Sequence, residues 1–290
     1  MVNIEDHYIQ TNGVHLHVLQ AGPIEGPLLI LLHGFPEFSY AWRDYIPYLA
    51  SAGFRVWVPD QRGYNLSDKP KGIASYTLDA LAKDVLGLID AAKHKQAFLV
   101  GHDWGGSVAW HIATKYPERI IKMIVLNVPH LGVLKKNLLS NAAQLRKSNY
   151  LFLLQVPWIP EIYIKFKQYM LLKKKFRISS RPGTFTDDDL ETYYRSWIQP
   201  KAFHSMLNWY RAAMQRPIRY RKTPHLTQPT LVIWGKKDKF LCSEMAQQSI
   251  DLCSEGHLIF FEEATHWIIH EEVSAIQKLI VSFFKESSIS

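Results

Sequence analysis

A chain of 290 residues that is 47% hydrophobic is long enough for one large α/β domain, or for a core with an inserted subdomain. It contains no apolar run of the ~18 residues that a membrane-spanning helix needs, and no glycine-rich phosphate loop. Its two cysteines, Cys242 and Cys253, have no metal-binding spacing, and residues 1–6 lack the apolar segment of a signal peptide. We therefore expect no cofactor, no metal and a cytoplasmic location.

The formal net charge of +8 is unevenly distributed. Residues 131–222 contain 18 Lys and Arg against 5 Asp and Glu, so the positive excess belongs to this internal segment. An asymmetry of this size indicates a boundary in the organisation of the chain. No nucleic-acid-binding motif accompanies the charge, so we do not expect nucleic acid as a partner.

The first predicted element is a β-hairpin. Polar and apolar residues alternate in 7–10 and 14–19, and Asn12-Gly13 between them is a strong turn signal. Continuous apolar runs then predict strands that are buried on both faces: 28–32, 55–59, 98–100, 123–126, 231–234 and 257–261. Helical patterns lie between these runs, notably in 78–92, 107–116 and 272–284. The alternation predicts an α/β fold, with a mostly parallel sheet and helices on both faces.

The regular alternation stops near His130 and resumes near Thr230. The residues between read as helices separated by proline-containing breaks, and they coincide with the basic segment. We therefore predict an α/β core at 1–130 and 223–290, interrupted by a helical cap domain at 131–222.

One turn carries the strongest chemical signal. Gly101, Asp103 and Gly105 stand between the strand at 96–100 and the helical pattern at 107–116, which is the arrangement of a nucleophile elbow. Most proteins with this elbow have Ser at its centre, but here the residue is Asp103. A carboxylate suits displacement at an sp3 carbon, which gives an ester that water then cleaves. The turn therefore predicts epoxides or alkyl halides as substrates.

A carboxylate nucleophile needs a base to activate water and an acid to orient that base. His266 is the candidate base, because it follows the last predicted strand at the edge of the sheet where ligands bind; His270 is a weaker candidate. Asp238 is the candidate orienting acid; alternatively, it is a solvated acid in a loop among lysines, without a role in catalysis. The order Asp103, Asp238, His266 is that of the α/β-hydrolases.

The hydrolysis of such an ester also needs donors for the oxyanion. The loop after the strand at 28–32 can place the backbone N–H of Phe35 opposite that of Trp104. Trp104 lies at a helix N-terminus, just before the helical pattern at 107–116, where N–H groups lack intrahelical partners. We expect these two N–H groups to form the oxyanion hole.

With these residues in place, the chain resembles the epoxide hydrolases of the α/β-hydrolase superfamily over essentially its whole length. Residues 33–37, His-Gly-Phe-Pro-Glu, resemble the family's HGxP motif, in which the Phe35–Pro36 peptide bond is expected to be cis. Residues 101–106, Gly-His-Asp-Trp-Gly-Gly, resemble its nucleophile motif.

The resemblance also implies roles for side chains in the cap. Tyr150 and Tyr210 match the positions of two cap tyrosines whose hydroxyls hydrogen-bond the epoxide oxygen and donate a proton as the ring opens. We further expect His33, Pro36 and Trp104 to line the substrate pocket.

The implied reaction is the hydrolysis of a small-molecule epoxide to a vicinal diol through a covalent ester on Asp103. An alternative is a dehalogenase that acts on alkyl halides, because haloalkane dehalogenases share the Asp-Trp-Gly-Gly motif. Phe35 has no side-chain donor where many of those enzymes have a halide-binding Asn, which favours the epoxide. A non-catalytic ligand-binding or membrane-associated protein on this scaffold is a second alternative.

The basic residues at 162–177 are interleaved with aromatic and aliphatic residues. They fit a solvated helical face, a surface that associates weakly with anionic membranes, or a surface that attracts anionic substrates such as fatty-acid epoxides. The sequence alone leaves these three possibilities open, and it does not indicate an oligomeric state.

Overall fold

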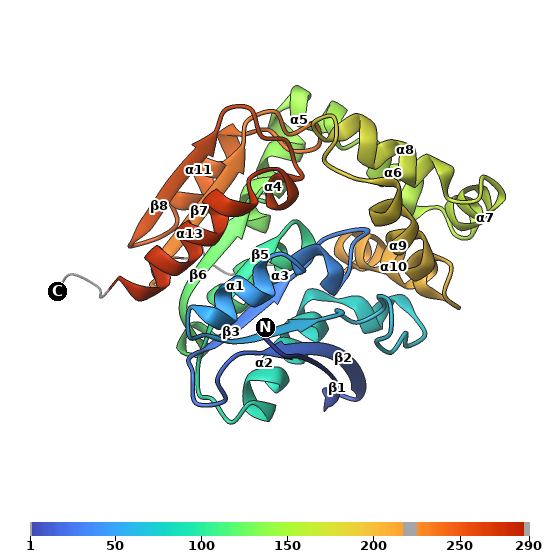
Figure 1. The fold of residues 1–290 in the computed structure, drawn as a ribbon. Helices are drawn as coiled ribbons and strands as arrows, with labels where there is room; N and C mark the ends of the chain where they lie inside the picture. The colour runs from blue at the N-terminus through green and yellow to red at the C-terminus, as the bar shows by residue number, and fades with distance from the viewer. Residues whose placement is uncertain (1, 217–224, 287–290) are drawn as a thin grey trace.

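The computed structural model describes residues 2–216 and 225–286. At its centre is a sheet of eight strands in the order β1-β2-β4-β3-β5-β6-β7-β8 (Figure 1). The pairs β1–β2 and β2–β4 are antiparallel, and all other neighbours are parallel. The strands are β1 Ile4–Thr11, β2 Val14–Ala21, β3 Leu28–Leu32, β4 Arg55–Pro59, β5 Ala97–His102, β6 Ile120–Leu126, β7 Thr230–Gly235 and β8 Gly256–Phe261. The predicted, mostly parallel sheet is confirmed.

Burial explains the sequences of the inner strands. Every residue of β3, β5 and β7 is buried, as expected for strands covered by helices on both faces. The antiparallel end is made by the hairpin of β1 and β2, whose two turn residues, Asn12 and Gly13, have φ values of 44° and 75°. These positive values are those of the tight turn that Asn-Gly favours.

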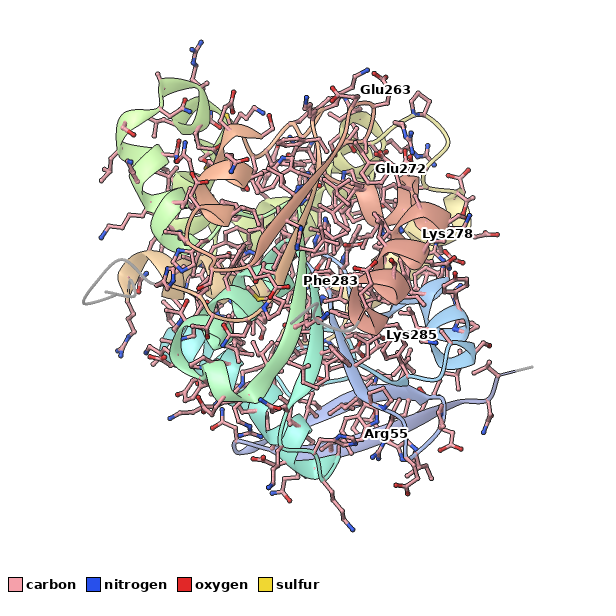
Figure 2. The ribbon with its side chains drawn as sticks, turned by 90° about the vertical axis from the view of Figure 1, so that its left-hand side faces the viewer. Arg55, Glu263, Glu272, Lys278, Phe283 and Lys285 are labelled. Atoms are coloured by element: carbon pink, nitrogen blue, oxygen red, sulfur yellow. The ribbon has the colours of Figure 1, made fainter. Side chains whose placement is uncertain are left out.

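Helices cover both faces of the sheet, and alternate residues of its inner strands pack on opposite sides. In β3, for example, Ile30 and Leu32 pack with the side of α2, α3 and α11, whereas Leu29 and Leu31 pack with the side of α1 and α13. Figure 2 shows α13 from outside, where its Lys278 and Lys285 are exposed. These helices are α1 Tyr45–Ser51, α2 Leu78–Ala91, α3 Trp104–Lys115, α11 Glu244–Ile250, α12 Ile268–Glu271 and α13 Val273–Lys285; short 3-10 turns span Ser39–Trp42, Ile73–Tyr76 and Pro117–Arg119.

A helical insertion lies between β6 and β7 and arches over one end of the sheet, with α7 at its outer edge (Figure 1). Its helices are α4 Leu131–Ser140, α5 Ala142–Lys147, α6 Tyr150–Gln155, α7 Ile159–Phe166, α8 Met170–Ser179, α9 Asp187–Trp197 and α10 Ala202–Gln215. Two buried indoles attach it to core loops: Trp197 Nε1 donates to Pro36 O (2.6 Å), and Trp209 Nε1 donates to Arg62 O (3.0 Å). The expected boundary at 222/223 lies outside the described residues. Within the described ranges, no helix is both long and apolar enough to cross a membrane.

Candidate active site

Asp103 is the single residue between β5 and α3, and its φ of 50° lies in the left-handed region. Close backbone contacts around it explain the flanking glycines. A Cβ on Gly101 would lie 2.5 Å from Gly105 O, and a Cβ on Gly105 would lie 2.2 Å from Leu32 O. Only glycine fits at these two positions, so the predicted elbow geometry is present and holds Asp103 at the end of the strand.

The carboxylate of Asp103 lies between a backbone donor and an imidazole. The Phe35 N–H donates to Oδ1 (2.9 Å), and Oδ2 lies 3.5 Å from His266 Nε2. Burial by itself would raise the pKa of Asp103, but the hydrogen bond and charge of His266, together with the Phe35 N–H, lower it below its ordinary value. Asp103 is therefore ionised at neutral pH, as a nucleophile must be. The Phe35–Pro36 peptide bond is cis, as the sequence predicted.

His266 lies between two carboxylates. Its Nδ1 is 2.8 Å from Asp238 Oδ2, and its Nε2 faces Asp103. Burial alone would lower the pKa of His266, but the two carboxylates outweigh it and raise that pKa to about 10. The imidazole is therefore protonated at neutral pH for as long as Asp103 carries its negative charge.

Asp238 is held by three donors besides His266. Its Oδ1 accepts the N–H groups of Phe240 (2.7 Å) and Leu241 (3.0 Å), and its Oδ2 accepts Asn127 Nδ2 (2.7 Å). The charge and hydrogen bond of His266, followed by the bonds from Asn127 and Phe240, lower the pKa of Asp238 against the effect of burial. It is 3% exposed, which rules out the solvated loop acid considered above.

Asn127 is a site residue that the sequence did not reveal. It follows β6, has a φ of 47°, and bonds on both sides: Nδ2 donates to Asp238, and Oδ1 accepts the N–H of Gly235 (2.9 Å). It thereby fixes the start of the loop that carries Asp238. The only signal in the sequence was an Asn at the carboxyl end of a buried strand.

Tyr150 and Tyr210 reach the site from the insertion. The ring of Tyr210 in α10 makes edge contacts with Phe35 (centroids 5.1 Å apart) and Trp104 (5.0 Å). Tyr150, the first residue of α6, interacts with Tyr210 through its hydroxyl. Burial, followed by the negative charge of Asp103 among other groups, raises the pKa of both hydroxyls. Both tyrosines therefore carry their protons at neutral pH.

A cavity of about 1340 Å³ lies over Asp103. Its wall includes the expected site residues Phe35, Pro36, Asp103, Trp104, Tyr150, Tyr210 and His266. The rest of the wall is largely apolar and comes mainly from the insertion. This volume exceeds the roughly 300–1,000 Å³ of most small-molecule sites, so a bulky or long apolar substrate fits it.

Known proteins share both the sequence and this arrangement. Residues 27–273 match the family model of the α/β hydrolase fold. Epoxide hydrolase 4 of Homo sapiens is 37% identical over 97% of this chain and 78% of its own length. The chain belongs to the epoxide hydrolases of the α/β-hydrolase family.

Two further similar proteins are bacterial. The AB hydrolase superfamily protein YfhM of Bacillus subtilis is 45% identical to it over 98% of this chain and 99% of its own length. The crystal structure of Bacillus megaterium epoxide hydrolase in complex with an inhibitor superposes with a TM-score of 0.88, at 30% identity, over 97% of this chain and 100% of that one.

Not every expected residue of the hydrolase lines the pocket. His33 is fully buried and is not part of the cavity wall. Its Nε2 instead accepts the N–H of Gln61 (3.0 Å), while Gln61 Nε2 donates to His33 O (2.6 Å). His33 therefore joins two loops beneath the site, which corrects the expectation that it contacts substrate.

A buried carboxylate, Glu37, lies behind the site. Its Oε1 accepts Tyr193 Oη (2.8 Å) from α9 and lies 2.6 Å from His270 Nε2 in α12, while its Oε2 lies 3.3 Å from His102 Nδ1. His102 Nε2 in turn donates to the backbone oxygen of His266 (2.8 Å). Burial would raise the pKa of Glu37, but the two histidines lower it. His270 therefore partners Glu37 rather than Asp103, which leaves His266 as the candidate base.

Proposed function

We propose that the hydrolase converts an epoxide into a vicinal diol in two steps through an ester of Asp103. The observation that carries this proposal is one apolar cavity bordered by the ionised carboxylate of Asp103, the protonated hydroxyls of Tyr150 and Tyr210, and His266. The helical insertion at 131–222 acts as the cap that supplies both tyrosines.

In the first step, an oxygen of Asp103 attacks the less hindered or more electrophilic carbon of the epoxide. The bond from that carbon to the epoxide oxygen breaks as Tyr150 or Tyr210 donates its proton to that oxygen, and the resulting tyrosinate regains a proton from solvent. The product is a hydroxyalkyl ester of Asp103. A positioned proton donor of this kind typically contributes about 10²–10⁴ in rate.

Formation of the ester changes the environment of His266. Asp103 loses its negative charge, so one of the two carboxylates that raise the pKa of His266 disappears. The imidazolium therefore releases its proton to solvent, and the neutral imidazole, still oriented by Asp238, accepts a proton from water. That water attacks the carbonyl carbon of the ester, and the N–H groups of Phe35 and Trp104 stabilise the oxyanion. The bond between the carbonyl carbon and the substrate oxygen breaks, His266 gives its proton to the departing alkoxide, and the diol leaves. The carboxylic acid of Asp103 then gives its proton to His266, which restores the starting state.

A cytoplasmic location stays a prediction from the cysteine usage. Cys242 and Cys253 are both free thiols, which is compatible with a reducing compartment.

The mechanism is tested with styrene oxide and the variants Asp103→Ala and His266→Gln. We expect Asp103→Ala to form no diol, because it has no nucleophile. We expect His266→Gln to form the ester but to hydrolyse it at least about 10²-fold more slowly, because it has no general base. Mass spectrometry of its peptides should then show a styrene oxide adduct on Asp103.

A peptide without the adduct, together with normal turnover by His266→Gln, would contradict the assignment of the base. A parallel assay of halide release from 1-bromobutane addresses the alternative reaction. Halide release without diol formation would identify a dehalogenase and leave the two tyrosines as packing residues.

A further inference from the structure

Helix α7 turns an apolar stripe outward. Ile159, Ile162, Tyr163 and Phe166 follow the i, i+3, i+4, i+7 spacing of one helix face, yet they are 58%, 66%, 50% and 75% exposed. A stripe with this spacing normally faces the core of a protein. In the described part of the chain, nothing covers it.

The neighbouring helices extend this apolar surface. Of the 22 exposed large apolar side chains among the described residues, 11 lie between residues 152 and 178. We call the exposed side chains of α6–α8 and their connecting turns the outer face, and its main apolar members are Phe152, Leu153, Trp158, Ile159, Ile162, Tyr163, Phe166, Met170, Leu171 and Ile178. Contiguous apolar surface of this kind marks an interaction site rather than ordinary exposure.

The outer face is also basic. In residues 2–216 and 225–286, no carboxylate lies within ion-pair distance of three of its exposed lysines, Lys165, Lys167 and Lys174. Lys175 also has no carboxylate partner, but its Nζ lies over the ring of Phe240 at the cavity wall. Lys173 and Arg177 pair with Glu191 and Asp187 of α9. The unpaired cations beside the apolar stripe therefore suit a partner that is both apolar and anionic.

The one acid within α6–α8, Glu161, does not neutralise this charge. Its Oε1 lies 2.7 Å from Arg211 Nη1 and 2.7 Å from His204 Nδ1, both in α10, so it is turned toward the interior of the insertion. The outward face of α7 thus carries apolar groups and lysines without a balancing carboxylate of its own.

The active-site cavity reaches this same face. Leu153, Tyr163, Leu171 and Lys175 belong to the outer face, and they also line the cavity that contains Asp103. A partner that covers the outer face would therefore border the route to the active site.

We propose that the outer face docks on an anionic lipid bilayer. The apolar stripe of α7 inserts at the boundary between headgroups and acyl chains, and the lysines of α7 and α8 contact lipid phosphates. A second copy of the chain fits less well, because a symmetric dimer through this face would bring two sets of unpaired lysines together. The docking does not depend on the proposed reaction.

Sedimentation with vesicles tests the proposal. The full chain is mixed with phosphatidylcholine vesicles that contain or lack phosphatidylglycerol. The variants are Phe166→Asp, which interrupts the stripe, and Lys165→Gln with Lys174→Gln, which removes two cations. Their matched controls are Ile24→Asp, at a side chain that is 71% exposed in the loop before β3, and Lys93→Gln with Lys95→Gln after α2. Diol formation without vesicles checks that each variant folds.

We expect the wild type and both controls to sediment with the anionic vesicles and to be released as salt is raised. Removal of two lysines should lower the partition coefficient on the order of 25-fold, at roughly fivefold for each cation near the surface, and Phe166→Asp should abolish sedimentation. The proposal is overturned if the wild type does not bind anionic vesicles at low salt, or if the controls lose as much binding as the outer-face variants. It is equally overturned if Phe166→Asp separates a dimer seen by analytical ultracentrifugation and no lipid binds.

Discussion

At the scale of single residues, the site is governed by how carboxylates share protons with neighbouring imidazoles. His266 keeps its proton because Asp238 and Asp103 both face it, and Asp103 keeps its charge because His266 and the Phe35 N–H face it. Each group holds the other in the state from which the first step can begin. In the proposed mechanism, the second step becomes possible only after the first has removed one of these charges.

The protonation of His266 predicts how stability depends on pH. Its folded-state pKa of about 10 lies above its ordinary value of 6.5, so its contribution to the free energy of unfolding is fully present below about pH 6.5. That contribution is lost as the pH rises toward 10. Urea unfolding of the wild type and of His266→Gln, measured from pH 7 to pH 10, should show a steeper decline for the wild type. Parallel declines would show that His266 is not protonated in the folded enzyme.

The roles of other site residues could not be predicted from the sequence, because their partners are far away along the chain. Asn127 bonds Asp238 across 111 positions, and Glu37 lies against His270 across 233. No local pattern records such contacts. His266 and Asp238, by contrast, could be predicted, because each follows a recognisable strand and the edge of a parallel sheet collects such residues.

At the scale of elements, continuous apolar runs predicted β3 and β4 at the residues where they occur. A strand that is covered on both faces needs apolar side chains at every position, so its sequence is a continuous apolar run. The predicted start of α3 was less accurate. The pattern indicated a helix from residue 107, whereas α3 begins at Trp104 and includes Gly105 and Gly106. Glycine is a poor helix former, but the contact with Leu32 O excludes any larger residue from position 105.

The close approach of Gly105 to Leu32 O predicts that a substitution at Gly105 is more destabilising than one at another glycine in the first turn of a helix. Gly105→Ala should reduce stability by at least about 3 kcal/mol or prevent folding, because its Cβ meets backbone that cannot move aside. Gly132→Ala in α4 is the control, since its Cβ comes no closer than 3.2 Å to any neighbour, the side chain of His130. It should change stability by less than about 1 kcal/mol. Thermal unfolding of both variants makes the comparison, and similar losses would contradict the steric account.

The insertion illustrates what an element pattern cannot supply. Proline breaks predicted helices in this segment, but not their number or orientation, because α5, α6 and α7 have only 6, 6 and 8 residues. The spacing of the α7 stripe is that of a core-facing helix, so the sequence could not indicate that it points outward.

At the scale of the whole molecule, core and insertion together create one cavity, and its size predicts a preference for chain length. For terminal epoxides of 4 to 10 carbons, kcat/KM should rise about fourfold with each added methylene, which corresponds to roughly 0.8 kcal/mol of burial. The volume of about 1340 Å³ leaves room for the longest of these substrates. Diol formation measured below the solubility limit of each substrate tests this series. A plateau after the shorter members would show that part of the cavity is closed to substrate.

Glu37 has a consequence for chimeras of this hydrolase. Its charge is stabilised jointly by Tyr193 of the insertion, His270 of α12 and His102 of β5, and it has no exposed surface. An insertion grafted from a relative would complete the hydrogen bonds of Glu37 only if it brought a hydroxyl to the position of Tyr193. Without that donor, the graft would leave one bond of a buried anion unmade, directly behind His266, the proposed base. Exchange of the insertion in this enzyme is therefore constrained by a residue that lies outside the cavity wall.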